Sequence, residues 1–106
     1  MSSPTQEKLT LMRYIELLEE DDLVVSRPSA SCDQRIEFAT DDSRRVRPGT
    51  LFVCKGRAFK REYLLSAIAD GAVAYVSEVD YDVDLPAVIV SDIRRTLAVV
   101  ADAFYG

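Results

Sequence analysis

Hydrophobic and polar positions along this chain show two patterns, and together these predict helices that alternate with short strands. Apolar side chains recur every three or four positions in three segments, which predicts helices over about residues 10–20, 60–70 and 93–105. Thr10 and Asp92 have side chains that can cap the first and last of these helices. Gly71 stands where a left-handed residue is expected to end the second one.

Shorter apolar runs between the helices predict strands. In chain order they are a short strand or extended connector at Leu23–Ser26, an alternating half-buried strand at Arg35–Thr40, and buried strands at Thr50–Cys54, Ala72–Val76 and Ala87–Val90. The strand, helix and strand between Leu51 and Val76 have the length of a crossover unit, so these two strands should be parallel. The pattern predicts an α/β fold, a three-layer α/β/α sandwich with a mostly parallel or mixed sheet of four to five strands.

Length and composition indicate one small soluble domain. The chain has 106 residues, of which 48% are hydrophobic and 29% charged, as in ordinary globular proteins. Residues 1–8 are polar and are predicted to be a flexible N-terminus, with the folded domain over 9–106. No stretch approaches 18 apolar residues and no signal peptide is visible, so we expect a cytoplasmic protein without membrane contact. A net charge of −5 argues against a nucleic-acid partner.

The chain lacks the residues that several kinds of catalytic and metal site require. The chain has no histidine and only two cysteines, Cys32 and Cys54, which disfavours a zinc site and any Ser-His or Cys-His nucleophile. Cys54 continues an apolar run, so we expect a buried, inert thiol. The four glycines form neither a P-loop nor a dinucleotide-binding motif. We therefore predict no catalytic residue, metal or cofactor in this chain.

The acidic segment 78–85 alternates acidic and apolar residues. Asp80, Asp82 and Asp84 have the spacing that opens an EF-hand calcium loop. Leu85 and Ser91 stand where that loop requires glycine and glutamate, so we interpret the segment as a solvated edge or connector.

Basic residues gather in one place although the chain is acidic overall. Seven of the 13 lysines and arginines, and no acidic residue, lie between Ser43 and Arg61: Arg44, Arg45, Arg47, Lys55, Arg57, Lys60 and Arg61. The loops 41–47 and 55–60 follow two predicted strands, and ligands of open α/β sheets sit at the carboxyl ends of strands. Gly56 permits close approach of the backbone, Phe59 offers a stacking surface, and the next helix directs its positive end to the same place. The pattern predicts a site for a nucleotide diphosphate.

The same residues have an alternative interpretation. Basic loop side chains of soluble domains are often only solvated. Thr40, Asp42 and Ser43 are also typical turn residues, whose side chains bond to their own backbone. Asp42 and Arg44 are close enough in sequence to form a local ion pair.

Blocks of residues in a fixed order extend the pattern over nearly the whole chain. They are Thr40-x-Asp42-Ser43-Arg44-x-Val46-x-Pro48-Gly49-x-Leu51-Phe52-Val53, then Gly56, then Ala67-x-x-x-Gly71-Ala72-x-Ala74, then Pro86-x-Val88-Ile89-Val90-x-Asp92-x-Arg94, then Leu97 and Phe104-Tyr105-Gly106. In order and spacing these blocks resemble the N-terminal domain of the Mur ligases. The closest match is the type that adds the third peptide residue, UDP-N-acetylmuramoyl-L-alanyl-D-glutamate ligase.

The resemblance implies a cytoplasmic three-domain enzyme of peptidoglycan synthesis. Its first domain would bind the UDP part of UDP-MurNAc-L-Ala-D-Glu. A central domain would bind ATP and Mg²⁺, and a third would help to bind the incoming lysine or meso-diaminopimelate. Because the central and C-terminal ligase domains are absent from this chain, we expect it to be inactive alone. The alternatives are the N-terminal domain of the ligase that adds D-alanyl-D-alanine, or a stand-alone, non-catalytic nucleotide-binding module.

The resemblance also assigns residues to the UDP site. The implied contacts are Asp41 and Ser43 in one loop and Arg57, Ala58 and Phe59 in the other, supported by Thr40, Asp42, Arg44 and Gly56. The second loop departs from the commoner family pattern. Gly56-Arg57 replaces Gly-His, and Lys60-Arg61-Glu62 replaces Asp-Gly-His.

Overall fold

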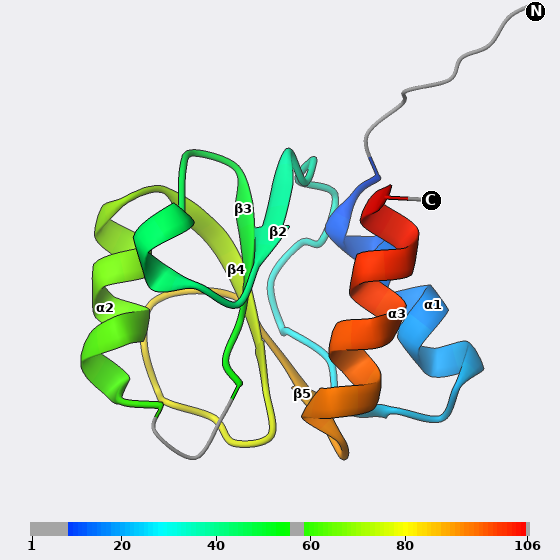
Figure 1. Ribbon diagram of the computed structural model, residues 1–106. Coiled ribbons are helices and arrows are strands. Elements are labelled where there is room, and N and C mark those ends of the chain that lie inside the picture. Colours follow the sequence, from blue (N-terminus) through cyan, green and yellow to red (C-terminus); the bar gives the residue numbers. More distant parts are fainter. Residues whose placement is uncertain (1–8, 56–58, 106) are drawn as a thin grey trace, which may run out of the picture.

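The computed structural model describes residues 9–55 and 59–105 (Figure 1). Its elements are, in chain order, α1 (Leu11–Glu20), β1 (Val24–Ser26), β2 (Phe38–Thr40), a 3-10 helix (Ser43–Arg45), β3 (Thr50–Val53), α2 (Arg61–Ala69), β4 (Ala72–Ser77), β5 (Ala87–Val90) and α3 (Ile93–Tyr105). Helices α1 and α3 cover one face of the sheet and α2 covers the other. The predicted three-layer α/β/α sandwich is confirmed.

The five strands form one mixed sheet in the order β1-β5-β4-β3-β2. Strands β2 to β5 are parallel, and β1 joins β5 antiparallel at one edge. The predicted parallel pair is present, since Phe52 of β3 lies opposite Tyr75 of β4. All four residues of β3 are buried, as expected for a strand that is covered on both faces. The strand order could not be derived from the sequence.

Each face of the sheet has its own apolar core. On one face Leu11, Ile15 and Leu18 of α1 pack with Val100 of α3 against the sheet. On the other, Leu64 and Ala67 of α2 pack against Phe52 and Tyr75. Because the sheet contributes side chains to both, it is the element that joins the two cores.

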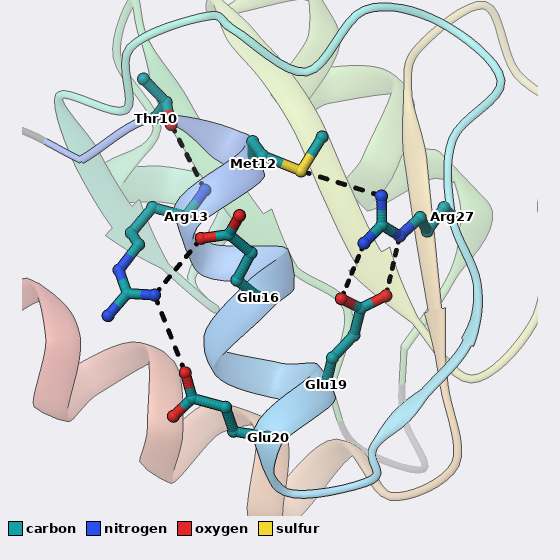
Figure 2. Close-up of polar contacts among 7 residues, drawn as sticks. All are labelled: Thr10, Met12, Arg13, Glu16, Glu19, Glu20 and Arg27. Carbon is teal, nitrogen blue, oxygen red and sulfur yellow. Dashed lines mark hydrogen bonds and ion pairs between the residues drawn. The ribbon is translucent and has the colours of Figure 1, made fainter.

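Helix α1 begins and ends where the pattern indicated. The hydroxyl oxygen of Thr10 accepts a hydrogen bond from the Arg13 N–H at 3.3 Å. The outer face of the helix carries ion pairs, which Figure 2 shows. Arg13 lies 3.3 Å from Glu16 and 3.7 Å from Glu20. Arg27, which follows β1, donates to both carboxylate oxygens of Glu19 at 2.7 Å, and these bonds lower the pKa of Glu19.

Strand β2 is shorter than the predicted segment Arg35–Thr40. The first part of that segment binds elsewhere: the Ile36 N–H donates to the Leu9 carbonyl at 2.8 Å, and the Glu37 N–H to the Gly49 carbonyl at 2.9 Å. The alternating pattern was therefore correct for Phe38–Thr40 alone. Within residues 9–55 and 59–105, no helix is long and apolar enough to cross a membrane.

Candidate functional site

The carboxyl ends of β2 and β3 border an open cavity of about 600 Å³, here called the first hollow. Its described lining consists of Asp41, Asp42, Ser43, Arg44, Phe52, Lys55, Phe59 and Tyr63. The loop after β2 and the loop after β3 therefore meet at one place, as the topology of parallel neighbouring strands requires. Gly56, Arg57 and Ala58, which the resemblance assigns to the second loop, lie outside the described residues.

The loop after β2 is held by its own side chains. The Thr40 hydroxyl oxygen accepts from the Asp42 N–H at 3.1 Å, and an Asp42 carboxylate oxygen accepts from the Arg44 N–H at 2.9 Å. The Arg44 guanidinium donates to both carboxylate oxygens of Asp42 at 3.1 Å, which holds the pKa of that carboxyl below its ordinary value. The turn and local ion-pair interpretation is thus correct for Thr40, Asp42 and Arg44, which shape the loop.

Ser43 and Asp41 differ from these three. The Ser43 hydroxyl makes no hydrogen bond to any of the described residues, although it lines the first hollow. Asp41 reaches across to the other loop, where its carboxylate lies 3.7 Å from the Lys55 ammonium. This ion pair is the direct polar link between the two strand-end loops in the described part of the chain.

Phe59 stands in a group of aromatic rings. Its ring centroid is 5.4 Å from that of Tyr81, 5.9 Å from Tyr63 and 6.2 Å from Phe52. Such tilted and edge-on contacts fix the Phe59 ring in a partly buried position. In the structure the Phe59 ring forms part of the wall of the first hollow, and its expected role as a stacking surface stays a prediction.

Tyr81 has a structural role that its place in the acidic segment did not indicate. Segment 78–85 is a connector, as expected, but Tyr81, Val83 and Leu85 pack on the core that includes Phe59. The Tyr75 hydroxyl accepts a hydrogen bond from the Tyr81 N–H at 3.1 Å and donates to Asp80 at 3.3 Å. The apolar residues that alternate with the aspartates in segment 78–85 were the sequence signal for this packing.

A second hollow of about 660 Å³ adjoins the first at the ends of β3, β4 and β5. Lys55 and Phe59 line both hollows. The second hollow also contains Glu78, Asp92 and Arg94. Both carboxylates bind the start of α3: the Ile93 N–H donates to Glu78 at 2.8 Å, and the Arg94 N–H donates to Asp92 at 3.1 Å. The backbone at the start of α3 is therefore already occupied by the chain's own acids.

The basic residues that the structure describes in this region point to several different partners. The Arg45 and Arg47 guanidinium groups lie over the Phe38 ring, 5.5 and 4.0 Å from its centroid. Arg61 donates to the Tyr81 carbonyl at 3.4 Å. In the described lining of the first hollow, Arg44 and Lys55 lie beside the carboxylates Asp41 and Asp42, and the diphosphate site stays a prediction.

Cys54 is buried beneath the second hollow, as predicted. Burial raises the pKa of its thiol from 9.0 to about 12. A thiol with this pKa is almost entirely protonated near neutral pH, and a protonated thiol is a poor nucleophile. Cys54 therefore contributes packing rather than reactivity.

A third hollow of about 490 Å³ lies beside the start of β5 and the end of β1. Arg27 and the three aspartates of segment 78–85 line it. Asp80 accepts the Asp82 N–H at 2.8 Å, so this carboxylate stabilises its own turn. The third hollow shares no described lining residue with the first or the second hollow.

Comparison with known proteins identifies relatives of this chain. No protein-family model matches it. UDP-N-acetylmuramoyl-L-alanyl-D-glutamate–L-lysine ligase of Streptococcus suis (strain 05ZYH33) is 41% identical to it over an alignment of 106 residues, which covers 92% of the chain. The enzyme of the same name from Streptococcus pneumoniae serotype 2 is 55% identical over 65 residues, or 61% of the chain. The chain is a homologue of the Mur ligases.

This Mur ligase homologue spans 22% of the length of the S. suis relative and 14% of the S. pneumoniae one. Its fold matches a D-alanyl-D-alanyl ligase structure from Acinetobacter baumannii with a TM-score of 0.67 over 96% of the chain. A crystal structure of MurF from the same species matches over 92% with a TM-score of 0.68. Both are 20% identical to this Mur ligase homologue, so these matches establish the fold alone.

Proposed function

We propose that this chain is the N-terminal domain of a cytoplasmic, ATP-dependent ligase of the lysine- or diaminopimelate-adding type, and that it binds the UDP part of UDP-MurNAc-L-Ala-D-Glu. The observation that carries the proposal is the 41% identity to an enzyme named for that substrate, over 92% of the chain. The product would enter peptidoglycan synthesis. The whole enzyme's activity would require the central and C-terminal domains.

The first hollow supports the location of the UDP site. It lies at the carboxyl ends of parallel strands, where nucleotides bind in open α/β sheets. Ser43 and Asp41 present polar side chains there, and Phe59 with Phe52 and Tyr63 provides an aromatic wall. Arg57 and Ala58 remain candidates from the resemblance. Thr40, Asp42 and Arg44 hold the loop in shape, which is the supporting role assigned to them.

ATP and Mg²⁺ do not fit the residues of this chain. The sequence contains no P-loop, and the first-turn N–H groups of α3 are bound by Asp92 and Glu78. We assign both to the central domain, and we assign no catalytic residue to this one.

The lysine-type relatives favour the first of the two ligase candidates. The structural neighbours act with D-alanyl-D-alanine, but at 20% identity they share only the fold. A stand-alone binding module would lack an ATP domain. Sequencing the gene beyond residue 106 distinguishes a ligase from a stand-alone module, because a ligase requires a G-T-x-G-K-T/S segment shortly downstream.

Titration with UDP, followed by amide NMR, tests the proposed binding. We expect shifts at Ser43 and Phe59, and a change of Ser43 to Ala should weaken binding by about three- to tenfold because one hydroxyl hydrogen bond is lost. Ser66→Ala, on the exposed face of α2, is the matched control and should leave the affinity unchanged. Unchanged spectra at millimolar UDP would refute the proposal.

A further inference from the structure

Lys55 occupies a distinctive place between the two hollows. Among the described residues it is the one cationic side chain that lines both. It shares this position with Phe59, whose ring forms part of the wall of each hollow. A ligand that extended from the first hollow into the second would therefore pass Lys55.

Four neighbouring arginines in the described part of the chain already have partners. Arg44 is fixed by two side-chain hydrogen bonds to Asp42. Arg45 and Arg47 lie over the Phe38 ring, and Arg61 binds a backbone carbonyl. Moving any of these groups to a new anion would disrupt the loop or its packing.

The contact between Lys55 and Asp41 is of a different kind. It is a single ion pair at 3.7 Å, and the two side chains are 40% and 39% exposed. Exposed single ion pairs contribute little to stability, because water screens both charges. Lys55 can therefore exchange Asp41 for the anion of a ligand at little cost.

The charge of Asp41 limits what it can contact. A carboxylate in the first hollow repels a diphosphate, and like charges at close range disfavour binding. It can, however, hold the flexible lysine side chain at the boundary between the hollows while no ligand is bound. This role differs from the direct nucleotide contact that the family resemblance implies for Asp41.

We propose that Lys55 binds the diphosphate of the ligand at the boundary of the two hollows, and that Lys55 is paired with Asp41 when no ligand is bound. The base lies in the first hollow beside Ser43 and the aromatic wall. The remainder of the ligand continues into the second hollow, where Arg94 is the other cation of the described lining. The inference rests on the proposed function and adds to it the residue that recognises the diphosphate.

Calorimetric titration with UDP and with uridine tests the role of Lys55. In the 106-residue chain, Lys55→Met should weaken UDP binding by at least about tenfold and leave uridine binding unchanged, because only UDP carries phosphate. Lys55→Arg should retain most of the UDP affinity. Lys60→Met is the matched control, since Lys60 is exposed and lines neither hollow, and it should bind both ligands like the parent chain.

Asp41→Asn tests the second half of the proposal. Removing the competing carboxylate should tighten UDP binding by about two- to threefold and leave uridine unaffected. The gain should vanish when the change is combined with Lys55→Met. A loss of uridine binding in Asp41→Asn would show a direct contact with the base and overturn this assignment.

The outcomes separate the inference from the function. If UDP binds but Lys55→Met binds it like the parent chain, the inference is wrong while the proposed function stands. If UDP does not bind the parent chain at all, both are wrong.

Discussion

Gly71, which follows the C-cap residue of α2, must be a glycine because of its surroundings. Its φ is +111°, and a Cβ atom added there would lie 2.6 Å from the Cα of Pro48 and 2.8 Å from the Pro48 nitrogen. Backbone atoms cannot move aside as a side chain can. The positive φ alone disfavours every residue with a Cβ.

We therefore expect Gly71→Ala to destabilise the domain by about 3 kcal/mol, because strain and steric overlap add. Gly49→Ala is the comparison. Gly49 also has a positive φ of +86°, but the added atom would meet Glu37 Cγ at 2.7 Å and Glu37 Cβ at 2.9 Å. A rotamer change can move Cγ, although Cβ is fixed by the backbone. Urea denaturation should show the smaller loss for Gly49→Ala, and equal losses would contradict the argument.

Cys54 gives a prediction for alkaline pH. Its thiol has a pKa of 9.0 when unfolded and about 12 in the folded chain, because burial disfavours the thiolate. Below pH 9 both states keep the proton and the contribution to stability is fully present. Between pH 9 and 12 only the unfolded state loses the proton, so stability falls, at most by about 1.4 kcal/mol per pH unit.

Denaturation at several pH values from 8 upwards measures this slope. Tyr14, Tyr75 and Tyr81 also have pKa values raised by burial, so the parent chain alone does not isolate the thiol. The difference between the parent chain and Cys54→Ala does, because only the thiol is removed. Parallel curves for the two proteins would show that Cys54 does not titrate in this range.

At the scale of single elements, the start of α3 is held by two acidic side chains, Asp92 and Glu78. Asp92 accepts hydrogen bonds from the Arg94 and Arg95 N–H groups, both at 3.1 Å. Glu78, from the end of β4, adds a bond to the Ile93 N–H at 2.8 Å. A helix start with three of its N–H groups satisfied is well fixed relative to the sheet.

Asp92→Ala should lower the free energy of unfolding by about 1 kcal/mol, because two backbone donors lose their acceptor. Asp92→Asn is the matched control, since its amide oxygen can still accept both bonds. Thermal or urea denaturation of the three proteins gives the comparison. A loss in Asp92→Asn as large as that in Asp92→Ala would point to charge rather than capping.

The elements also show which features the sequence could predict. The helices were predictable because apolar spacing, Thr10, Asp92 and Gly71 marked their bounds locally. The strand order depends on contacts between distant segments, which no local pattern records. The start of β2 was misplaced for the same reason, because Ile36 binds Leu9.

In the candidate site, too, some features could be predicted from the sequence and others depend on contacts between distant residues. The meeting of the two loops could be predicted, because both follow neighbouring parallel strands. The pairing of Asp41 with Lys55, and the stacking of Arg45 and Arg47 on Phe38, depend on side-chain geometry. Counting basic residues could not reveal that most of these charges were already engaged.

At the scale of the whole molecule, the sheet connects two apolar cores that have no helix in common. Leu64 of α2 is fully buried on one face, and Ile15 of α1 is fully buried on the other. Strands β3 and β4 contribute side chains to both. Loss of either core removes support from the same strands, so the domain should unfold in one step.

Leu64→Ala should destabilise the whole domain by about 3 kcal/mol, because it leaves a cavity in the core. Leu65→Ala is the matched control: Leu65 is its neighbour, 43% exposed, and should change stability by less than about 0.5 kcal/mol. Circular dichroism and tyrosine fluorescence should report the same transition in both variants. Separate transitions for the two probes would show that the faces unfold independently.

The contact between the turns that precede β3 and β4 has a mechanical consequence. The Gly49 N–H donates to the Gly71 carbonyl at 3.0 Å, and Gly71 fits closely against Pro48. These contacts fix the register of β3 against β4 at their N-terminal ends, so neither strand can slide along its neighbour. The two hollows lie at the opposite ends. A ligand that pulls on Lys55 pulls on a strand anchored at its far end, and the resulting motion is confined to the loops.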